Sequence, residues 1–208
     1  MMVNPSAHLV SIEETEEHLR LHWRFTALMP FDQARQRLQD YFAQLGYTPI
    51  ASENNTLTMR RGAGDAALDW SPRSKKAELI AHFAPSGNRT SVTLELRIGG
   101  DWLYEAETRL YAWELVEAEQ YLHGEPVNLE AMKRFNHNLR MQAFRAFARG
   151  FATGLLLAAL AGLILYPMLT GMGIGKWLLK AIVGAVMNII VFWQVARAMR
   201  LTLGSRKR

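Results

Sequence analysis

The side chains of this chain that are able to do acid–base chemistry are few and widely spaced. Its six histidines show no metal-ligand spacing such as His-Glu-x-x-His. Only His22 and His82 fall on the polar face of predicted strands, where Arg60 and Glu95 accompany them. One hypothesis is therefore an enzyme whose site combines these four side chains.

The same polar face is mostly basic, and its charged members are Arg20, Arg24, Arg60, Glu95 and Arg97. A set of this kind is able to hold an anion or an acidic peptide. The alternative is an ordinary solvated face, since antiparallel sheets commonly bury one face and expose the other. The face lacks aromatic residues on which bases stack, so we expect no nucleic-acid partner.

Other motifs of catalysis or cofactor binding are missing from the sequence. The glycines that follow Arg60 and Arg61 lack the Lys-Ser/Thr ending of a phosphate-binding loop, and Ser71 lacks the Gly-x-Ser-x-Gly setting of a serine nucleophile. No cysteine is present, which excludes disulfides, thiolate catalysis and cysteine-ligated zinc. We therefore expect no cofactor and no metal, and we predict that the protein is not an enzyme.

The polar side chains must be positioned by a domain of helices and strands over residues 19–124. Alternation of apolar and polar residues predicts strands at 19–27, 47–51, 56–61, 77–83 and 92–98. Helical spacing predicts helices over 32–45 and 102–123, the second capped by Asp101. The order strand, helix, four strands, helix predicts an α+β fold in which both helices cover one face of an antiparallel sheet.

This element order, over roughly residues 19–123, resembles the TATA-box-binding-protein-like arrangement, a curved sheet with helices on its convex side. The resemblance lies in the order of elements and includes no motif residues. It therefore implies a fold and no activity.

The helix predicted over 102–123 carries two apolar stripes with Glu107 and Glu114 between them. One stripe is expected to cover the sheet, which leaves the other to meet a second surface. The second stripe either packs on the first helix or on the segment that follows, or it forms a partner-binding face. The residues of that face are Tyr104, Tyr111, Leu115 and Leu122.

Charge is unevenly divided along the chain. Residues 1–130 carry 12 basic and 19 acidic side chains, a formal charge of −7, whereas residues 131–208 carry 12 basic side chains and no acid. Residues 1–18, with four glutamates between 13 and 17, are expected to be a flexible acidic lead and not a secretory signal. Residues 127–149 are predicted to form a basic amphipathic helix at a membrane surface, either among anionic lipid headgroups or as a plain connector.

Two apolar runs, 151–170 and 177–196, are each long enough to cross a hydrocarbon core of roughly 30 Å. We predict a transmembrane hairpin over 150–197 and a basic tail over 198–208. Basic residues gather at the outer ends of the hairpin, which predicts cytoplasmic N- and C-termini, in the inner or plasma membrane of a bacterium. The arginines expected to contact anionic lipid headgroups are Arg140, Arg145, Arg149, Arg197 and Arg200.

Small residues recur at every fourth position of the first run, at Gly154, Ala158 and Gly162. They permit close helix packing between the two runs, in a dimer, or on a larger complex. Asn188, near the middle of the second run, is expected to form a cross-helix hydrogen bond. One amide gives no pathway for transport, so we predict that the hairpin is an anchor.

The sequence as a whole predicts a membrane-anchored, non-enzymatic protein whose cytoplasmic domain binds a protein partner, forms a homo-oligomer or serves as an accessory subunit. The alternative is a protein that handles a lipid or small ligand in a pocket between sheet and helices. The aromatic residues expected to line such a pocket are Trp23, Phe25, Trp70, Phe83 and Trp113.

Overall fold

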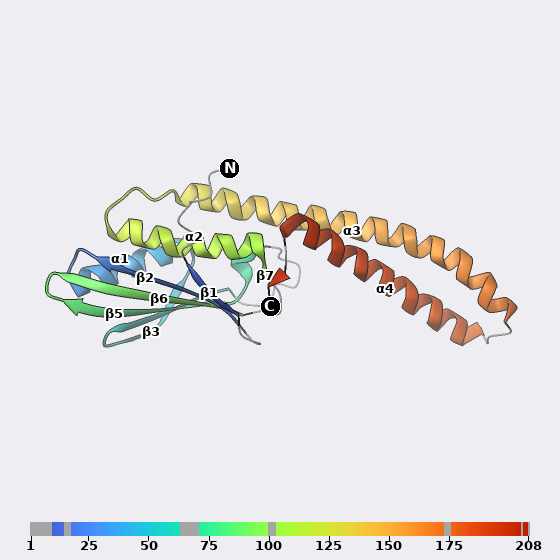
Figure 1. Cartoon of the computed structure of the whole chain (residues 1–208), viewed down its shortest axis with the longest axis horizontal. Coiled ribbons are helices and arrows are strands. Elements are labelled where there is room, and N and C mark those ends of the chain that lie inside the picture. Colours follow the sequence, from blue (N-terminus) through green and yellow to red (C-terminus); the bar gives the residue numbers. More distant parts are fainter. Residues whose placement is uncertain are drawn as a thin grey trace. The chain divides into compact units, whose positions relative to one another are not determined.

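The computed structural model describes residues 10–14, 18–62, 71–99, 103–172, 176–204 and 206–207 of the chain. Within these ranges, six strands form one antiparallel sheet in the spatial order β1-β2-β6-β5-β4-β3 (Figure 1). A separate two-residue pair joins β7, Leu103–Tyr104, to β8, Arg206–Lys207. The bounds of the sheet strands are β1 Ser11–Glu14, β2 His18–Ala27, β3 Thr48–Glu53, β4 Thr56–Arg61, β5 Ala77–Ser86 and β6 Arg89–Gly99.

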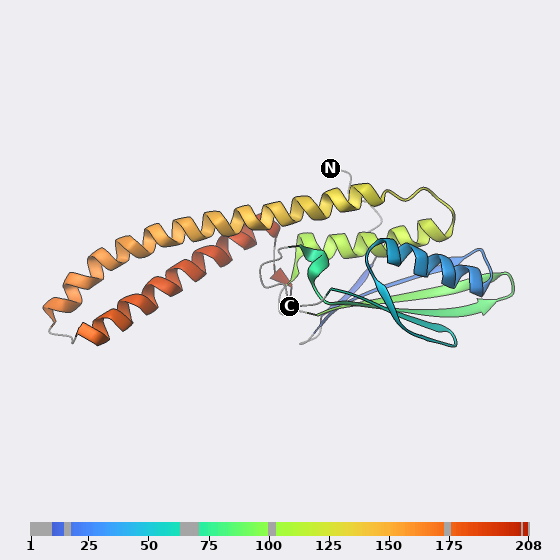
Figure 2. The ribbon, with the colours of Figure 1, turned by 180° about the vertical axis from the view of Figure 1, so that it is seen from behind.

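Two helices cover one face of this sheet. Helix α1 spans Phe31–Gln44 and α2 spans Glu105–Leu122, and both lie on the same side of the strands in two opposite views (Figures 1 and 2). The predicted α+β class and the order strand, helix, four strands, helix are therefore confirmed. The covered side is called the inner face below, and the other side the outer face.

Alternation along each strand separates the two faces. On β6 the side chains of Val92, Leu94, Leu96 and Ile98 are fully buried, and the residues between them are partly exposed. Successive strand side chains point to opposite faces, so the inner face is apolar and the outer face polar. The exception is on β4, where the inward positions end at Arg61, a charged side chain on the inner face.

Helix α2 is buried on nearly all sides, which corrects the prediction of a partner-binding face. Tyr111, Leu115 and Leu122 have no exposed surface, and Tyr104 at the start of the helix is half-buried. An apolar stripe that is already covered within the domain is not available to a partner. The alternative, that the second stripe packs within the chain, describes the structure.

The second cover over α2 is the beginning of α3, a 43-residue helix spanning Leu129–Gly171. Met132, Phe135 and Leu139 are buried, and the Phe135 ring contacts that of Trp113 edge to face with 5.9 Å between centroids. The apolar side of the predicted amphipathic helix is thus used inside the domain, at least as far as Leu139. Such a helix buries its apolar stripe on whichever apolar surface is adjacent, and here that surface is α2.

Two element boundaries differ from the sequence predictions. Ser11–Glu14 is a strand paired with β2, within the segment expected to be a flexible lead, because an edge strand needs backbone pairing more than apolar side chains. Helix α2 begins at Glu105, and the Glu107 carboxylate accepts the Tyr104 backbone N–H at 2.9 Å. The predicted cap Asp101, residues 1–9 and 15–17, and the end of the tail lie outside the described residues.

The described chain divides into two units. The first ends at Arg140 and includes the strand Arg206–Lys207; the second runs from Met141 and contains the rest of α3 together with α4, Lys176–Leu203. Both helices contain stretches long and apolar enough to cross a membrane, by length and composition. The basic helix predicted to precede the first apolar run is continuous with it in α3.

Candidate functional site

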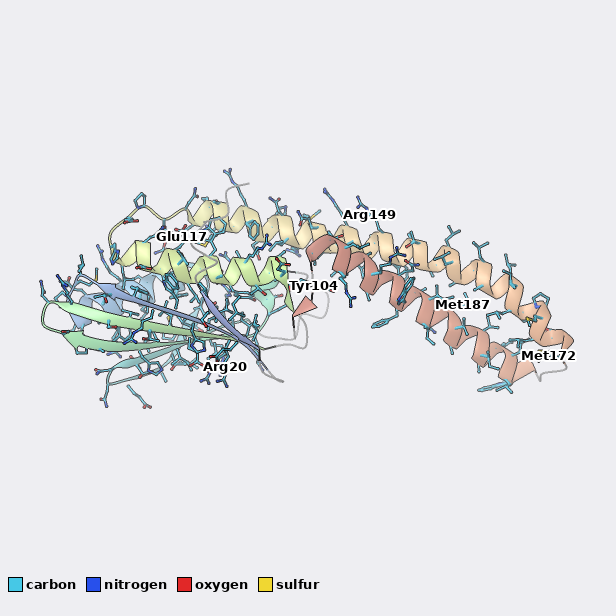
Figure 3. All side chains as sticks on the ribbon, in the orientation of Figure 1. Arg20, Tyr104, Glu117, Arg149, Met172 and Met187 are labelled. Carbon is cyan, nitrogen blue, oxygen red and sulfur yellow. The ribbon has the colours of Figure 1, made fainter. Side chains whose placement is uncertain are left out.

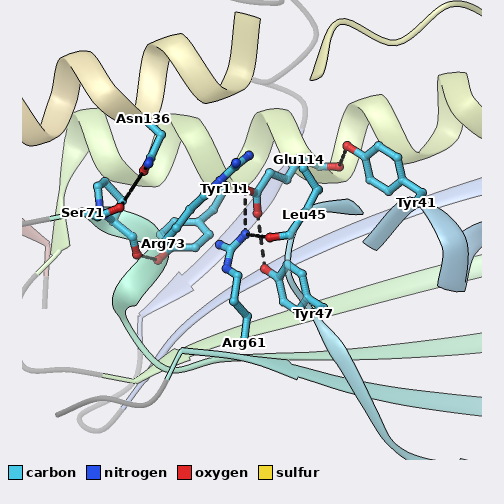
Figure 4. A network of polar contacts seen from close by, with 10 residues as sticks. Tyr41, Leu45, Tyr47, Arg61, Ser71, Arg73, Tyr111, Glu114 and Asn136 are labelled. Atoms are coloured by element: carbon cyan, nitrogen blue, oxygen red, sulfur yellow. Dashed lines mark hydrogen bonds and ion pairs between the residues drawn. The ribbon is translucent and has the colours of Figure 1, made fainter. Parts of the chain in front are cut away.

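Among the described residues, charged and polar side chains gather between the inner sheet face and α2 in a group called the buried cluster: Tyr47, Arg61, Arg73 and Glu114. One carboxylate oxygen of Glu114 accepts hydrogen bonds from Arg61 Nη1 and Arg73 Nε, each at 3.0 Å. Its other oxygen accepts the Tyr47 hydroxyl at 3.3 Å (Figure 4). Two cations and one anion therefore share a site in which the Glu114 side chain is 0% and that of Arg61 5% exposed.

Aromatic rings enclose the Arg61 guanidinium. Its carbon lies 4.3 Å from the centre of the Tyr47 ring and 5.6 Å from that of Tyr111, within the range of cation–π attraction. Burial alone lowers the pKa of Arg61, but the Glu114 carboxylate, together with Tyr47 and Tyr111, more than reverses this effect and raises that pKa above its ordinary value. Burial also raises the pKa of Tyr47 and Tyr111, so both hydroxyls stay protonated well into alkaline solution.

The segment from Ser71 to Lys75 closes the end of the cluster. Besides the contact of Arg73 with Glu114, Lys75 Nζ lies 2.8 Å from Glu107 Oε2, and the Tyr111 hydroxyl donates to the backbone carbonyl of Pro72. Gly62, at φ +81°, leaves room for this segment to pack against the backbone. A Cβ there would clash with the Lys75 carbonyl oxygen, from which it would lie only 2.2 Å away. The cluster therefore joins β4, the 3₁₀ helix Pro72–Ser74 and α2 into one polar core.

The outer face of the sheet carries a second charged group, which we call the outer cleft: Arg60, Lys76, Glu78 and Arg97. Arg60, Glu78 and Arg97 are cross-strand neighbours on β4, β5 and β6. With Lys76, and with Ala77 and Gly99 at the strand ends, they line a depression of about 200 Å³. The outer cleft holds three cations and one carboxylate, so it has two positive charges in excess.

The two arginines of the outer cleft, Arg60 and Arg97, are held by carboxylates but not enclosed. Arg97 Nε donates to Glu95 Oε1 at 2.7 Å, and Arg20 Nε lies 3.9 Å from the same oxygen. Burial works against ionisation of Glu95, but the hydrogen bond from Arg97 and the positive charges of Arg97 and Arg20 together outweigh it and lower the pKa of that carboxyl. Arg60 Nη2 lies 3.4 Å from Glu78 Oε1, and the Arg60 side chain is 50% exposed. Arg20 is labelled on this side of the sheet in Figure 3.

The histidines proposed for an enzyme site do not meet. His22 pairs across β2 and β6 with Glu95, and His82 pairs across β5 and β6 with Thr93, so a strand and a two-residue offset separate them. His22 Nε2 lies 3.6 Å from a Glu13 carboxylate oxygen, and the His82 ring contacts the Thr56 hydroxyl at 3.2 Å. His22, His82, Arg60 and Glu95 therefore form no single site.

The aromatic residues predicted to line an interior pocket pack instead into the core. Phe25, Phe83 and Trp113 are at most 6% exposed. Trp23 is half-buried and donates its indole N–H to Glu119 at 3.0 Å. Trp70, the fifth predicted member, lies outside the described residues.

In the second unit, α3 and α4 approach closely at glycines. A Cβ on Gly150 would lie 2.7 Å from Val195 Cα, and one on Gly154 would lie 2.8 Å from Val191 Cα. Further along α3, Ala158 is fully buried, whereas a Cβ on Gly162 would have room, with its nearest neighbour at 3.8 Å. Helix packing in the hairpin thus begins one turn before the predicted stripe.

Asn188 does not form the predicted cross-helix hydrogen bond. Its side chain is exposed, and its Nδ2 donates to the Gly184 carbonyl at 2.9 Å within α4. A Cβ on Gly184 would meet nothing within 4 Å, so this side of α4 faces away from α3. The amide is therefore satisfied locally, as polar residues in apolar helices often are.

Aromatic and basic side chains occur near both ends of the hairpin helices. Trp177 at the start of α4 is 88% exposed, and towards its other end the exposed Trp193 ring lies 5.5 Å from the Arg197 guanidinium carbon. Exposed Tyr166 lies near the end of α3. All five arginines predicted to contact headgroups are exposed: Arg140, Arg145, Arg149, Arg197 and Arg200. Arg149 is labelled in Figure 3.

Comparison with known proteins gives no functional lead. No protein-family model and no curated protein matches the chain. Among solved structures, CalU16 from Micromonospora echinospora is similar at 12% identity in its crystal structure, with a TM-score of 0.38 over 62% of this chain and 91% of that one. The protein encoded by gene BPP1335 of Bordetella parapertussis is similar at 13% identity, with a TM-score of 0.28 over 66% of this chain and 94% of that one. Likenesses this weak carry no argument about this chain.

The buried cluster was not predicted, although the sequence contains its signals. The alternation Leu57, Met59, Arg61 directs Arg61 to the apolar face, and Glu114 lies between two apolar stripes of its helix. When both stripes are covered, the glutamates between them become buried and need charged partners. The identity of those partners depends on tertiary contacts that the spacing of residues does not reveal.

Proposed function

We propose that this protein is a membrane-anchored, non-enzymatic binding or accessory protein, whose α+β domain is tethered by a two-helix hairpin with both ends on the cytoplasmic side. The observation that supports the anchor is the hairpin itself. Gly150 and Gly154 bring α3 and α4 together, while large apolar side chains of both helices remain exposed on the outside. An apolar surface of this extent on paired long helices is typical of lipid-facing helices.

The distribution of aromatic and basic residues supports the same anchor. Trp177 and Trp193 are 16 residues apart on α4, about 24 Å along a helix, which is close to the separation of the two bilayer interfaces where tryptophan is enriched. Arg197 and Arg200 follow the second of these, and Arg145 and Arg149 precede the first apolar run. The excess of arginine at that end favours the cytoplasmic side of an inner or plasma membrane, beside anionic lipids.

The outer sheet face supports the binding role. The inner face is closed by α1 and α2, and α2 is itself covered by the start of α3, so this side of the sheet offers no surface to a partner. The outer face presents charged side chains held by cross-strand pairing, and this is the surface on which a protein partner or an anionic ligand would bind. The lipid- or small-ligand-handling alternative draws its support from the outer cleft and not from an interior pocket.

Insertion and orientation are tested with single cysteines, since the chain has none of its own. Met172→Cys, between the two helices, should react with a membrane-impermeant maleimide in intact cells, and Ser86→Cys, in the domain, only after permeabilisation. The chain should also resist extraction from membranes by alkaline carbonate. Labelling of Ser86→Cys in intact cells would overturn the orientation, and release by carbonate would overturn the anchor.

A further inference from the structure

We propose that the outer cleft formed by Arg60, Lys76, Glu78 and Arg97 is a binding site for a phosphate-bearing anion, either a free phosphate compound or the phosphate of a lipid headgroup. This inference deepens the proposed binding role and names the chemistry of its ligand. It does not depend on insertion of the hairpin, since the cleft lies within the first unit.

Charge is the first argument. The outer cleft has three cations and one carboxylate, and the adjoining pair of Arg20 and Glu95, which contacts Arg97, adds one charge of each sign, so two positive charges remain in excess. A phosphate monoester carries between about −1.5 and −2 charges at pH 7, so one such group would neutralise the outer cleft. A carboxylate ligand would leave about one positive charge uncompensated.

Geometry is the second argument. Arg60 and Arg97 flank Glu78 on neighbouring strands, and Lys76 immediately precedes β5, the strand of Glu78. Arginine side chains bind phosphate through paired N–H groups, and lysine binds it as a point charge. The hydrogen bond from Arg97 to Glu95 uses only Nε. It therefore fixes the position of the guanidinium group and leaves the two Nη groups to donate to a ligand. Preorganised cations lose less side-chain freedom on binding.

Size is the third argument. Pockets for drug-sized ligands are about 300–1,000 Å³, whereas the outer cleft measures about 200 Å³. Gly99 lines the outer cleft without a side chain that would occupy part of it. A small headgroup suits this volume better than a whole lipid or a nucleotide base.

The test is calorimetric titration of the full-length chain in non-ionic detergent at pH 7 and low salt, with inorganic phosphate and with glycerol 3-phosphate. Both probes should bind at a single site. Arg60→Gln and Lys76→Gln should each weaken binding by about tenfold or more, since each removes a charged hydrogen-bond donor. Arg24→Gln is the matched control, because Arg24 is exposed on the same face but pairs with Thr93, outside the outer cleft.

Glu78→Gln provides a readout that a merely structural role would not give. It removes the one negative charge of the outer cleft, so phosphate should bind several-fold more tightly than to the unaltered chain. Nanodiscs of neutral lipid, with and without phosphatidic acid, distinguish the two sources. If the ligand is a headgroup, phosphatidic acid should compete with glycerol 3-phosphate, and if it is free phosphate, the two kinds of nanodisc should give equal affinities.

Two results would overturn the proposal. One is the absence of saturable binding of either probe at millimolar concentration by folded protein. The other is binding that Arg24→Gln weakens as much as Arg60→Gln does, which would indicate a general attraction to the basic face. Neither result would bear on the labelling and extraction tests of the anchor, so the two proposals fail separately.

Discussion

Arg60 and Arg61 are consecutive residues of β4 with opposite surroundings. Arg61 is enclosed by Tyr47, Tyr111 and the Glu114 carboxylate, whereas the Arg60 side chain is half exposed beside Glu78 on the other face. The pleat of the strand alone sends neighbouring side chains to opposite faces. The comparison teaches that the same residue type stabilises the fold on one face and remains available for a ligand on the other.

The largest effect is expected from removing Glu114, the carboxylate that Arg61 and Arg73 share, because this tests whether Arg61 stabilises the fold. Glu114→Ala leaves the buried Arg61 and the part-buried Arg73 without their carboxylate, and we expect a loss of about 3–5 kcal/mol in the free energy of unfolding. Urea unfolding of the full chain in detergent, followed by tryptophan fluorescence, measures it. Glu105→Ala, on the same helix but in the exposed pair with Arg109, should cost no more than about 0.5 kcal/mol.

Equal losses for the two glutamate variants would contradict the assignment of Glu114 to the core. So would a Glu114→Ala chain that unfolds at the same urea concentration as the unaltered protein.

A second contrast between covered and open positions lies in the hairpin. Gly154→Ile inserts a branched side chain where α4 already lies 2.8 Å from the added Cβ, whereas Gly184→Ile adds one into open space. Overpacking typically costs about 1–3 kcal/mol, so only the first change should separate the helices. The measurement is disulfide formation between Gly162→Cys and Val183→Cys, which should fall in the Gly154→Ile background and persist with Gly184→Ile.

Cross-linking that is insensitive to both isoleucines would show that α3 and α4 do not pack through Gly154.

Alkaline pH should produce a smaller, gradual loss of stability, which tests whether the tyrosines around Arg61 are buried. Burial raises the pKa of Tyr47, Tyr111 and Tyr41, whose hydroxyl donates to the Glu114 backbone carbonyl at 2.9 Å, so the folded state holds their protons more tightly than the unfolded state does. Their contribution to stability is complete below about pH 10, the unfolded pKa of tyrosine, and is lost as the pH rises above it. Ultraviolet absorbance should show these three hydroxyls ionising only as the chain unfolds.

Three buried tyrosines that ionised near pH 10 in a chain still folded by circular dichroism would contradict the enclosure of the cluster.

Much of the first unit could be predicted from the sequence, because its strands alternate strictly and its helices show clear apolar spacing. The strands over Leu19 to Ala27 and Val92 to Ile98 were predicted from the alternation of apolar and polar residues alone. Of the two alternatives for the stripe of Leu115, the structure shows packing within the chain, and the sequence did not decide between them because an apolar stripe does not say what covers it. The start of α3 was predicted as an amphipathic helix. That its apolar side packs on α2 and not on lipid depends on contacts between distant segments, which the spacing of residues does not reveal. Asn188 illustrates the same limit. Its position in the span predicted a hydrogen bond to another helix, whereas in the structure it donates to the Gly184 carbonyl of its own helix.

The central claim, that β4 separates a structural arginine from a ligand-binding one, is tested most directly by one measurement on two variants. Arg60→Gln and Arg61→Gln are compared by thermal unfolding of the full chain, with and without saturating glycerol 3-phosphate. The account predicts that Arg60→Gln keeps the unfolding temperature of the unaltered chain but loses its rise with ligand. Arg61→Gln should unfold at a lower temperature yet retain the rise. The reverse pattern, or the same pattern in both variants, would contradict the claim.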